Sequence, residues 1–127
     1  MDKFEVITAG GPVSVPLSPA LRAGDYIFVS GQVPVNPETG EIIGRTVEEQ
    51  TEAVLKRIDG ILHAAGSSLK DVVKTTVFMT DIKQFDRMNK TYRKFFPHHF
   101  PARSCVEIKL AIDVALEIEA IAYAPKK

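Results

Sequence analysis

Three residues near the C-terminus could carry chemistry: Arg103 and Cys105 in the run ARSCVEI, and Glu117 in the run LEIEAIAY. An unpaired guanidinium is costly to bury, so Arg103 must reach solvent, meet a carboxylate of its own chain or bind a ligand that brings one. Its planar fork suits a carboxylate, and each charge-assisted bond contributes about 1.5 to 3 kcal/mol. A salt bridge to Glu117 or Glu119 is the structural alternative.

Glu117 is a candidate general acid or base, provided that burial tunes its pKa towards neutrality. A solvated surface role is the alternative, because glutamates on strands mostly face water. Cys105 has no activating base close to it in the sequence, and a lone cysteine in a strand is most often a small hydrophobe. The sequence therefore favours packing over nucleophilic catalysis for its thiol.

The sequence contains no recognisable metal or nucleotide motif. The spacing of His63, His98 and His99 fits neither HExxH nor a zinc finger, and no glycine-rich phosphate loop occurs. Gly31 follows the strand-like run YIFVS, where the absence of a side chain would let a ligand approach its backbone N–H. An ordinary strand-end glycine is the alternative at that position.

Composition limits the class of protein. With 127 residues, 45% of them hydrophobic, the chain is expected to form a single domain spanning residues 1–127. Sixteen basic residues balance sixteen acidic ones without a long run of either sign, so nucleic acid is not a favoured partner. The single cysteine excludes an internal disulfide, and the sequence shows neither a secretory signal nor a membrane span, which makes a cytoplasmic location the expectation.

Patterns of hydrophobic and turn-forming residues predict the elements that position these side chains. Thr46 and Glu49 form a capping box ahead of a helical repeat that Gly66 ends, whereas Asp81 and Gln84 open a second helix that ends before Pro97. The NPETG run predicts a turn. The expected strands are 4–8, 26–30, 41–43, 72–80, 102–108 and 116–123, and the expected helices are 47–65 and 82–96.

This order of elements predicts a two-layer α/β sandwich with the helices on one face of the sheet. Alternation places Arg103 and Cys105 on one face of their strand, and Glu117 on the less apolar face of the last strand. If these two strands form a hairpin centred near Ala111, Cys105 lies opposite Glu117 with Arg103 in diagonal reach. Such a mixed face is awkward for a monomer, so a second subunit is expected to cover it.

Five runs together resemble the RidA (YjgF/YER057c/UK114) family of reactive-intermediate deaminases. These runs are SGQVPVNPETGEI, VVKTTVFMTD, MNKTYRKFF, FPARSCVEI and EIEAIAYA, and the resemblance covers residues 25–124. It implies a chorismate-mutase-like subunit with a mixed sheet and two helices on one face, assembled as a homotrimer with ligand clefts at the subunit boundaries. It also implies a cofactor-independent hydrolase that converts 2-iminopropanoate and 2-iminobutanoate to 2-oxo acids and ammonia.

The same resemblance assigns roles to individual residues. Arg103, within PARSCVE, corresponds to the arginine that binds the substrate carboxylate, and Glu117, the first acid of EIEAIA, to the glutamate that positions water. The backbone at Cys105 would help to hold ligand and water. Ser30 and Gly31 would line the ligand site, and Asn89 of MNKTY would lie at the cleft.

Two departures from the family pattern bear on the function. Many members carry a ligand-contacting tyrosine where this chain has Leu17, so that hydroxyl is absent unless Ser18 or Tyr26 replaces it. The segment between Cys105 and the last strand is one residue shorter than usual, which leaves Glu119 as an alternative to Glu117. Three other functions stay open: a carboxylate-sensing regulatory trimer, a pathway-specific deaminase of aminoacrylate or 2-aminomuconate type, and a ribonuclease or translation inhibitor.

Overall fold

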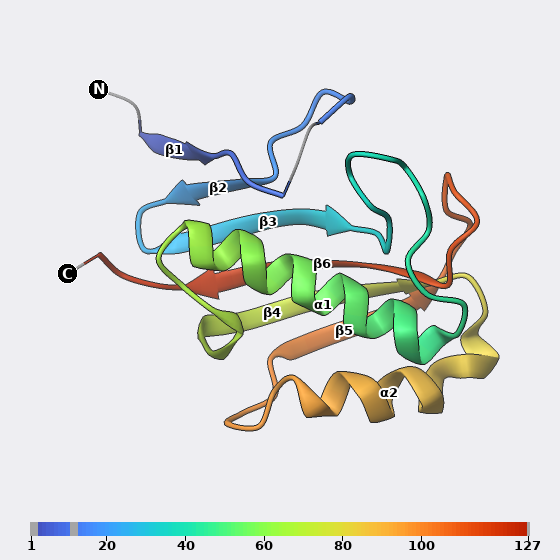
Figure 1. Ribbon diagram of the computed structural model, residues 1–127. Helices are drawn as coiled ribbons and strands as arrows, with labels where there is room; N and C mark the ends of the chain where they lie inside the picture. The colour runs from blue at the N-terminus through green and yellow to red at the C-terminus, as the bar shows by residue number, and fades with distance from the viewer. Residues whose placement is uncertain (1–2, 11–12, 127) are drawn as a thin grey trace.

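A computed structural model describes residues 3–10 and 13–126, and it consists of one six-stranded sheet with both α-helices packed on the same face (Figure 1). This arrangement confirms the predicted two-layer sandwich. Two short 3-10 helices, η1 and η2, precede β4 and α2. In chain order the elements are β1 (Phe4–Ile7), β2 (Ala20–Ala23), β3 (Tyr26–Gln32), α1 (Val47–Ala64), η1 (Leu69–Asp71), β4 (Val72–Met79), η2 (Ile82–Gln84), α2 (Phe85–Lys94), β5 (Ala102–Glu107) and β6 (Leu116–Tyr123).

The strands lie in the order β1-β2-β3-β6-β4-β5, and β4 and β5 run parallel whereas the other neighbouring pairs are antiparallel. The expected hairpin between the last two strands is therefore wrong, because β4 lies between them. Val77 of β4 pairs with Cys105 of β5 on one side and with Ile118 of β6 on the other. The regular apolar alternation of β6 suits this central position, where one of its faces is covered by the helices.

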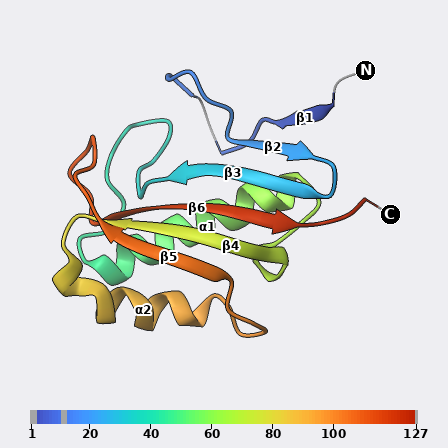
Figure 2. The same cartoon turned by 180° about the vertical axis from the view of Figure 1, so that it is seen from behind.

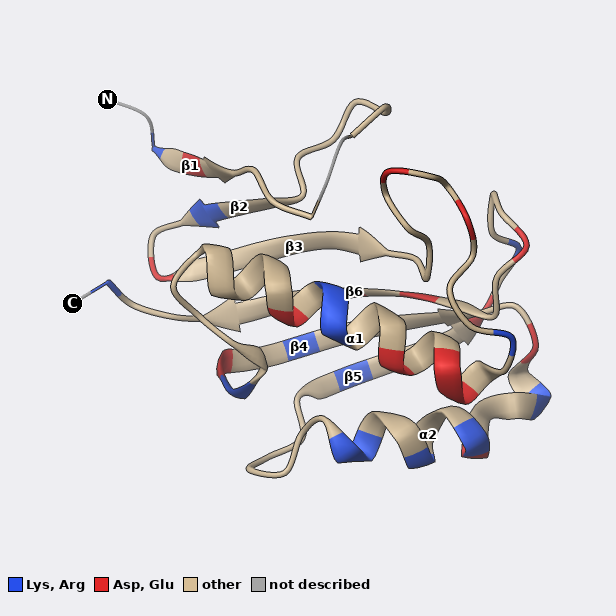
Figure 3. Cartoon of the chain, in the orientation of Figure 1, with Lys and Arg blue, Asp and Glu red and all other residues tan. Residues whose placement is uncertain are grey.

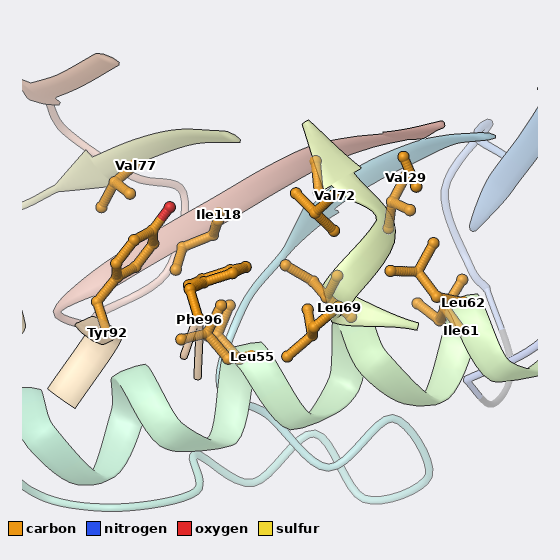
Figure 4. Packing of buried hydrophobic residues seen from close by; sticks show 14 of the residues in the cluster. Val29, Leu55, Ile61, Leu62, Leu69, Val72, Val77, Tyr92, Phe96 and Ile118 are labelled. Atoms are coloured by element: carbon orange, nitrogen blue, oxygen red, sulfur yellow. The ribbon is translucent and has the colours of Figure 1, made fainter. Parts of the chain in front are cut away.

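Helix α1 begins as predicted. The Thr46 hydroxyl accepts a hydrogen bond from the Glu49 backbone N–H at 3.1 Å, and the Glu49 carboxylate accepts one from the Thr46 N–H at 3.2 Å. This reciprocal pair satisfies two backbone donors that the first helical turn would otherwise leave free. The apolar stripe that follows packs on the sheet, and Figure 4 shows Leu55 and Leu62 of α1 facing Val72 and Ile118 of the strands.

The second helix starts later than predicted. Asp81 caps η2 by accepting from the Lys83 backbone N–H at 3.0 Å, and α2 itself begins at Phe85, after a Gln84 that makes no side-chain cap. Competition between 3-10 and α-helical bonding at a helix start explains the difference. The helix ends at Lys94, ahead of Pro97 as expected.

The glycine- and proline-rich N-terminal third holds one strand that the pattern missed and lacks one that it predicted. The short run of β2 pairs Ala20 with Val29 of β3, whereas residues 41–43 contribute only an isolated bridge from Ile42 to Val35. The intervening turn is confirmed, because the Gly40 backbone N–H donates to the Asn36 carbonyl at 2.7 Å. A turn this tight brings two segments together without requiring a ladder.

The sheet face opposite the helices, here called the open face, is visible in Figure 2. Four large apolar side chains on it are 43% to 46% exposed, namely Tyr26, Phe28, Val106 and Tyr123. The rings of Tyr26 and Tyr123 lie 5.3 Å apart, so part of this surface is aromatic. Neither of the α-helices described is long and apolar enough to span a bilayer.

Candidate functional site

Arg103 projects from β5 towards the helices. Its guanidinium carbon lies 4.8 Å from the ring centroid of Tyr92 and 5.5 Å from that of Phe85, both on α2, and Nη1 lies 4.0 Å from the Met88 sulfur. The Tyr92 ring is held in place by a 2.6 Å hydrogen bond between its hydroxyl and that of Thr75. Aromatic faces attract and orient a guanidinium without neutralising it.

No carboxylate within residues 3–10 and 13–126 lies within 4.0 Å of Arg103. The alternative of a salt bridge to Glu117 or Glu119 is therefore wrong for this chain. The guanidinium instead lines a cavity of about 270 Å³ between α2 and β5, together with Asn89, Tyr92, Arg93, Phe100 and Pro101. Figure 3 shows that basic positions are spread along α2, the helix that forms one side of this cavity. With two guanidinium groups and no acid in its lining, the cavity is suited to an anion.

Glu117 lies on the open face, where its carboxyl group covers Gly31. A β-bulge interrupts the pairing of β3 with β6 between Val29 and Gln32, and Gly31 sits inside it. A Cβ atom added to Gly31 would lie 2.8 Å from the Glu117 carboxyl carbon, so a side chain at this position would displace the acid. No side chain fits at this position while Glu117 keeps its place, so close approach of the acid, rather than a strand-end conformation, accounts for the glycine.

Burial raises the pKa of Glu117 above its ordinary value, and the neighbouring negative charge of Glu119 raises it further. Glu119 is itself exposed and pairs with Thr76 on the side of β6 away from the bulge. A carboxyl group whose pKa is moved towards neutrality is better suited to exchanging protons than an ordinary one. The geometry thus favours Glu117 over Glu119 as the acid beside Gly31.

The segment before β2 packs beside the bulge. The Ser30 hydroxyl donates to the Ser18 carbonyl at 2.6 Å, and the Ser30 backbone N–H donates to the Pro19 carbonyl at 3.0 Å. Leu17, 48% exposed, precedes them and lines a hollow of about 410 Å³. Tyr26 stands at the far end of β3, about 16 Å from Gly31 by strand geometry, so within one subunit its hydroxyl lies far from the bulge.

Cys105 faces the helices and packs against the hydrophobic core. Burial raises the pKa of its thiol, and the nearby charge of Arg103 opposes that shift only in part. The neutral thiol is therefore the dominant form at neutral pH. This environment supports the expected packing role for Cys105.

The predicted residues fall into two clusters. Arg103 and Asn89 share the cavity on the helix side, whereas Glu117 lies over Gly31 on the open face, with Ser30 next to Gly31 in the bulge. The expectation that Arg103 and Glu117 share one wall is wrong, because it rested on the hairpin that β4 replaces. Pairing of Arg103 with the buried Thr75 turns the arginine towards α2, and pairing of Glu117 with Phe78 turns the acid away.

Sequence reasoning missed the residues that support Arg103. Phe85, Met88 and Tyr92 lie three and four positions apart on α2, which places them on one face of the helix. That spacing was visible in the sequence as an apolar stripe. The contact of this stripe with Arg103 could not be seen in the sequence, because it depends on the parallel pairing of β5 with β4, which places β5 beside α2.

The fold and the two clusters define a small α/β domain with a cavity whose lining includes two guanidinium groups. The endoribonuclease L-PSP family matches residues 10–124, and the chain belongs to this family, which is the RidA/YjgF family that the sequence motifs resemble.

Relatives from different organisms are similar over nearly the whole chain. A RutC family protein of Pyrococcus abyssi is 46% identical over 97% of this chain and 98% of its own. The 2-iminobutanoate/2-iminopropanoate deaminase of Escherichia coli is 44% identical, over 92% of this chain and 94% of its own. The crystal structure of Escherichia coli TdcF with bound serine superimposes with a TM-score of 0.82 at 41% identity, covering 97% and 98% of the two chains.

Proposed function

We propose that the protein is a deaminase that hydrolyses short 2-imino acids, such as 2-iminopropanoate and 2-iminobutanoate, to 2-oxo acids and ammonia. The observation that carries this proposal is the Arg103 guanidinium, which lines an open cavity without a carboxylate partner in the described chain. The name of the Escherichia coli relative supports the reaction class. TdcF with bound serine supports the capacity of this fold to bind a small carboxylate.

Arg103 would bind the substrate carboxylate through parallel N–H donors of its guanidinium group, in a bidentate arrangement. Each charge-assisted hydrogen bond of this kind contributes about 1.5 to 3 kcal/mol. The rings of Tyr92 and Phe85 hold the guanidinium in place before the ligand arrives, which reduces the entropy lost on binding. Asn89 lines the same cavity and adds an uncharged hydrogen-bonding group.

Hydrolysis needs a water molecule at C2 of the imine and a route for protons. Glu117, with its raised pKa, would take a proton from the attacking water as the C–O bond forms. The same carboxyl group then returns this proton to the nitrogen and relays the proton of the new C2 hydroxyl to it as well, so that the C–N bond breaks, ammonia leaves and the C2 carbonyl forms. Gly31, Ser30 and the Cys105 backbone would line the position of ligand and water, in line with the family resemblance.

The two clusters face opposite sides of one sheet, so Arg103 and Glu117 of the same chain would not act on one substrate. A site assembled from two copies resolves this, with Arg103 from one subunit and Glu117 from its neighbour. We therefore propose a homotrimer with clefts at the subunit boundaries. The exposed apolar side chains of the open face are consistent with burial against neighbouring copies.

The decisive experiment measures hydrolysis of 2-iminobutanoate generated in situ by a dehydratase. Arg103→Ala should reduce kcat/KM by roughly 10- to 150-fold, the range that corresponds to one lost charge-assisted bond. Arg87→Ala is the matched control, because Arg87 lies on α2, the helix that Arg103 packs against, but forms an ion pair with Glu48. Equal rates for wild type and Arg103→Ala would refute the carboxylate clamp, and no acceleration by folded wild type would refute the deaminase activity.

A further inference from the structure

Arg57 is a half-buried cation held only by neutral acceptors. From α1 it donates through Nε and Nη2 to the Gln32 side-chain oxygen, at 3.2 and 3.0 Å, and through Nη1 to the Val35 carbonyl at 2.9 Å. Within the part of the chain that the structure describes, it has no carboxylate within 4.0 Å. A cation that is partly desolvated without a counterion carries a cost, so its contacts call for a compensating role.

The first consequence of these contacts is a fixed orientation of the Gln32 amide. A guanidinium has only N–H donors, so the atom that Gln32 presents to Arg57 must be its oxygen. The amide nitrogen therefore points away, and it donates to the Ser30 carbonyl at 3.0 Å. Arg57, Gln32 and Ser30 thus form a continuous chain of hydrogen bonds that starts at a full positive charge.

The chain of bonds ends on the Ser30–Gly31 peptide group, the one inside the β-bulge under Glu117. A hydrogen bond accepted at a peptide oxygen polarises the whole amide, and a charged group at the start of the chain increases the effect. The N–H of the same peptide unit belongs to Gly31. The Gly31 N–H therefore becomes a stronger donor, and the hydrogen bond from Gln32 to the Ser30 carbonyl holds the bulge in place.

We propose that Arg57 is a positioning residue, which acts through Gln32 to orient and polarise the Ser30–Gly31 peptide so that the Gly31 N–H can bind an anionic oxygen of a 2-imino acid or of its tetrahedral adduct. The consequence for catalysis rests on the deaminase function proposed above. The polarisation of the Ser30–Gly31 peptide does not depend on that function, and it can be measured without any turnover.

Gln32→Glu is the most informative variant. A glutamate keeps an oxygen for Arg57 and exchanges the amide for a carboxylate of nearly the same shape, but it has no N–H to donate to Ser30. Arg57→Met removes the charge and leaves Gln32 in place, and Arg57→Lys restores a cation. Arg87→Met is the control for the loss of an arginine elsewhere on the helix layer, where its partner is the exposed Glu48.

The first readout is the backbone ¹⁵N chemical shift of Gly31, which reports hydrogen bonding at the preceding Ser30 carbonyl. It should move upfield in Gln32→Glu and in Arg57→Met, stay close to wild type in Arg87→Met, and return part of the way in Arg57→Lys. The second readout is the dissociation constant for pyruvate, which should rise about tenfold in the first two variants, the effect of roughly one hydrogen bond to a charged group.

The third readout is turnover of 2-iminobutanoate, for which kcat should fall more than KM changes. If wild type binds pyruvate but turns nothing over, the deaminase function fails while the first two readouts still decide the role of Arg57. An unchanged Gly31 shift in both Gln32→Glu and Arg57→Met would overturn the proposal. The proposal would also be overturned if the variants bound pyruvate more weakly only in proportion to their loss of thermal stability, and if Arg57→Lys did not restore binding.

Discussion

Arg103 and Glu117 project from opposite faces of the same sheet. Arg103 packs on Tyr92 of α2, whereas Glu117 covers the bulge at Gly31 on the face without helices. The strand between them, β4, is continuous and separates the two side chains. Within a single subunit, the group that would bind the substrate carboxylate and the group that would move its protons therefore cannot reach one small ligand.

This separation predicts complementation between two impaired variants. Arg103→Ala and Glu117→Gln should each lose most of the activity alone, but subunits unfolded and refolded together should recover part of it. For sites that draw one residue from each of two neighbours, random mixing leaves about a quarter of them intact, because closed oligomers repeat one interface. Specific activity of the mixed and separate samples measures this. Recovery near zero, with a normal oligomeric state, would argue that both residues act within one subunit.

Gly31→Ala should abolish turnover and leave the fold in place. The added Cβ would meet the Glu117 carboxyl group, with 2.8 Å to its carbon, and the acid would have to move away from the bulge. We expect at least a hundredfold loss of kcat/KM, since displaced catalytic groups lose their alignment. The change in thermal midpoint should be small, because the flexible Glu117 side chain can rotate away from the added methyl group.

Gly60→Ala provides a matched control for the same chemical change. Gly60 lies in the exposed middle of α1, and a Cβ there would have no neighbour within 4 Å. The substitution should stabilise the protein by about 0.5 to 1 kcal/mol, because alanine loses less entropy than glycine in a helix. Normal turnover in Gly31→Ala would show that Glu117 need not lie over the bulge.

The raised pKa of Glu117 predicts a pH-dependent stability. A carboxyl group with a higher pKa in the folded than in the unfolded state binds more protons when folded. Its contribution to the free energy of unfolding therefore falls as pH rises from about 4.5 through the folded pKa. Glu117→Gln should raise the thermal midpoint relative to wild type at pH 7 to 8, and the difference should vanish below about pH 4.

Thermal melts of wild type and Glu117→Gln across this pH range test the sign. Glu119→Gln should act in the same direction but less strongly, because burial is the larger cause of the shift and the Glu119 charge the smaller one. A wild type that is more stable than Glu117→Gln at pH 7 would mean that the carboxylate is stabilised in the fold rather than desolvated.

Local patterns predicted most of the fold because they act over a few residues. The capping box at Thr46, the turn at Asn36 and the alternation along β6 each depend on neighbours in sequence, and each is confirmed. The pairing of β5 was different, since two strands in sequence order favour a hairpin unless a third strand competes. Here β4 offers parallel pairing to Arg103 and Cys105, and no local signal distinguishes the two arrangements.

The candidate site shows the same division. The face of its own strand on which each of Arg103, Gly31 and Glu117 lies could be predicted, because alternation of side chains is a property of the strand. Their relation to one another could not, since it depends on which strands are neighbours. The contact between Gly31 and Glu117 arises from a β-bulge, which the sequence indicates only through the presence of a glycine.

Leu17 should determine which imines the site accepts. It is 48% exposed beside Ser18, whose carbonyl holds the Ser30 hydroxyl, and its hollow is lined by Val6, Thr8, Ala9, Val13, Ser18 and Pro19. An apolar side chain here favours substrates with apolar side chains, because a hydroxyl buried against it would lose hydrogen bonds to water. A tyrosine at this position would instead favour substrates that can accept a hydrogen bond from its hydroxyl.

Leu17→Tyr should therefore raise kcat/KM for 2-iminopropanoate by about 2- to 10-fold, the effect of one neutral hydrogen bond of about 0.5 to 1.5 kcal/mol. It should lower kcat/KM for imines with longer aliphatic side chains, which lose apolar contact. The thermal midpoint should change little, because the position has room at the surface. Leu17→Phe separates the two effects, since it adds the ring without the hydroxyl. Equal substrate preference in all three proteins would show that Leu17 lies outside the ligand site.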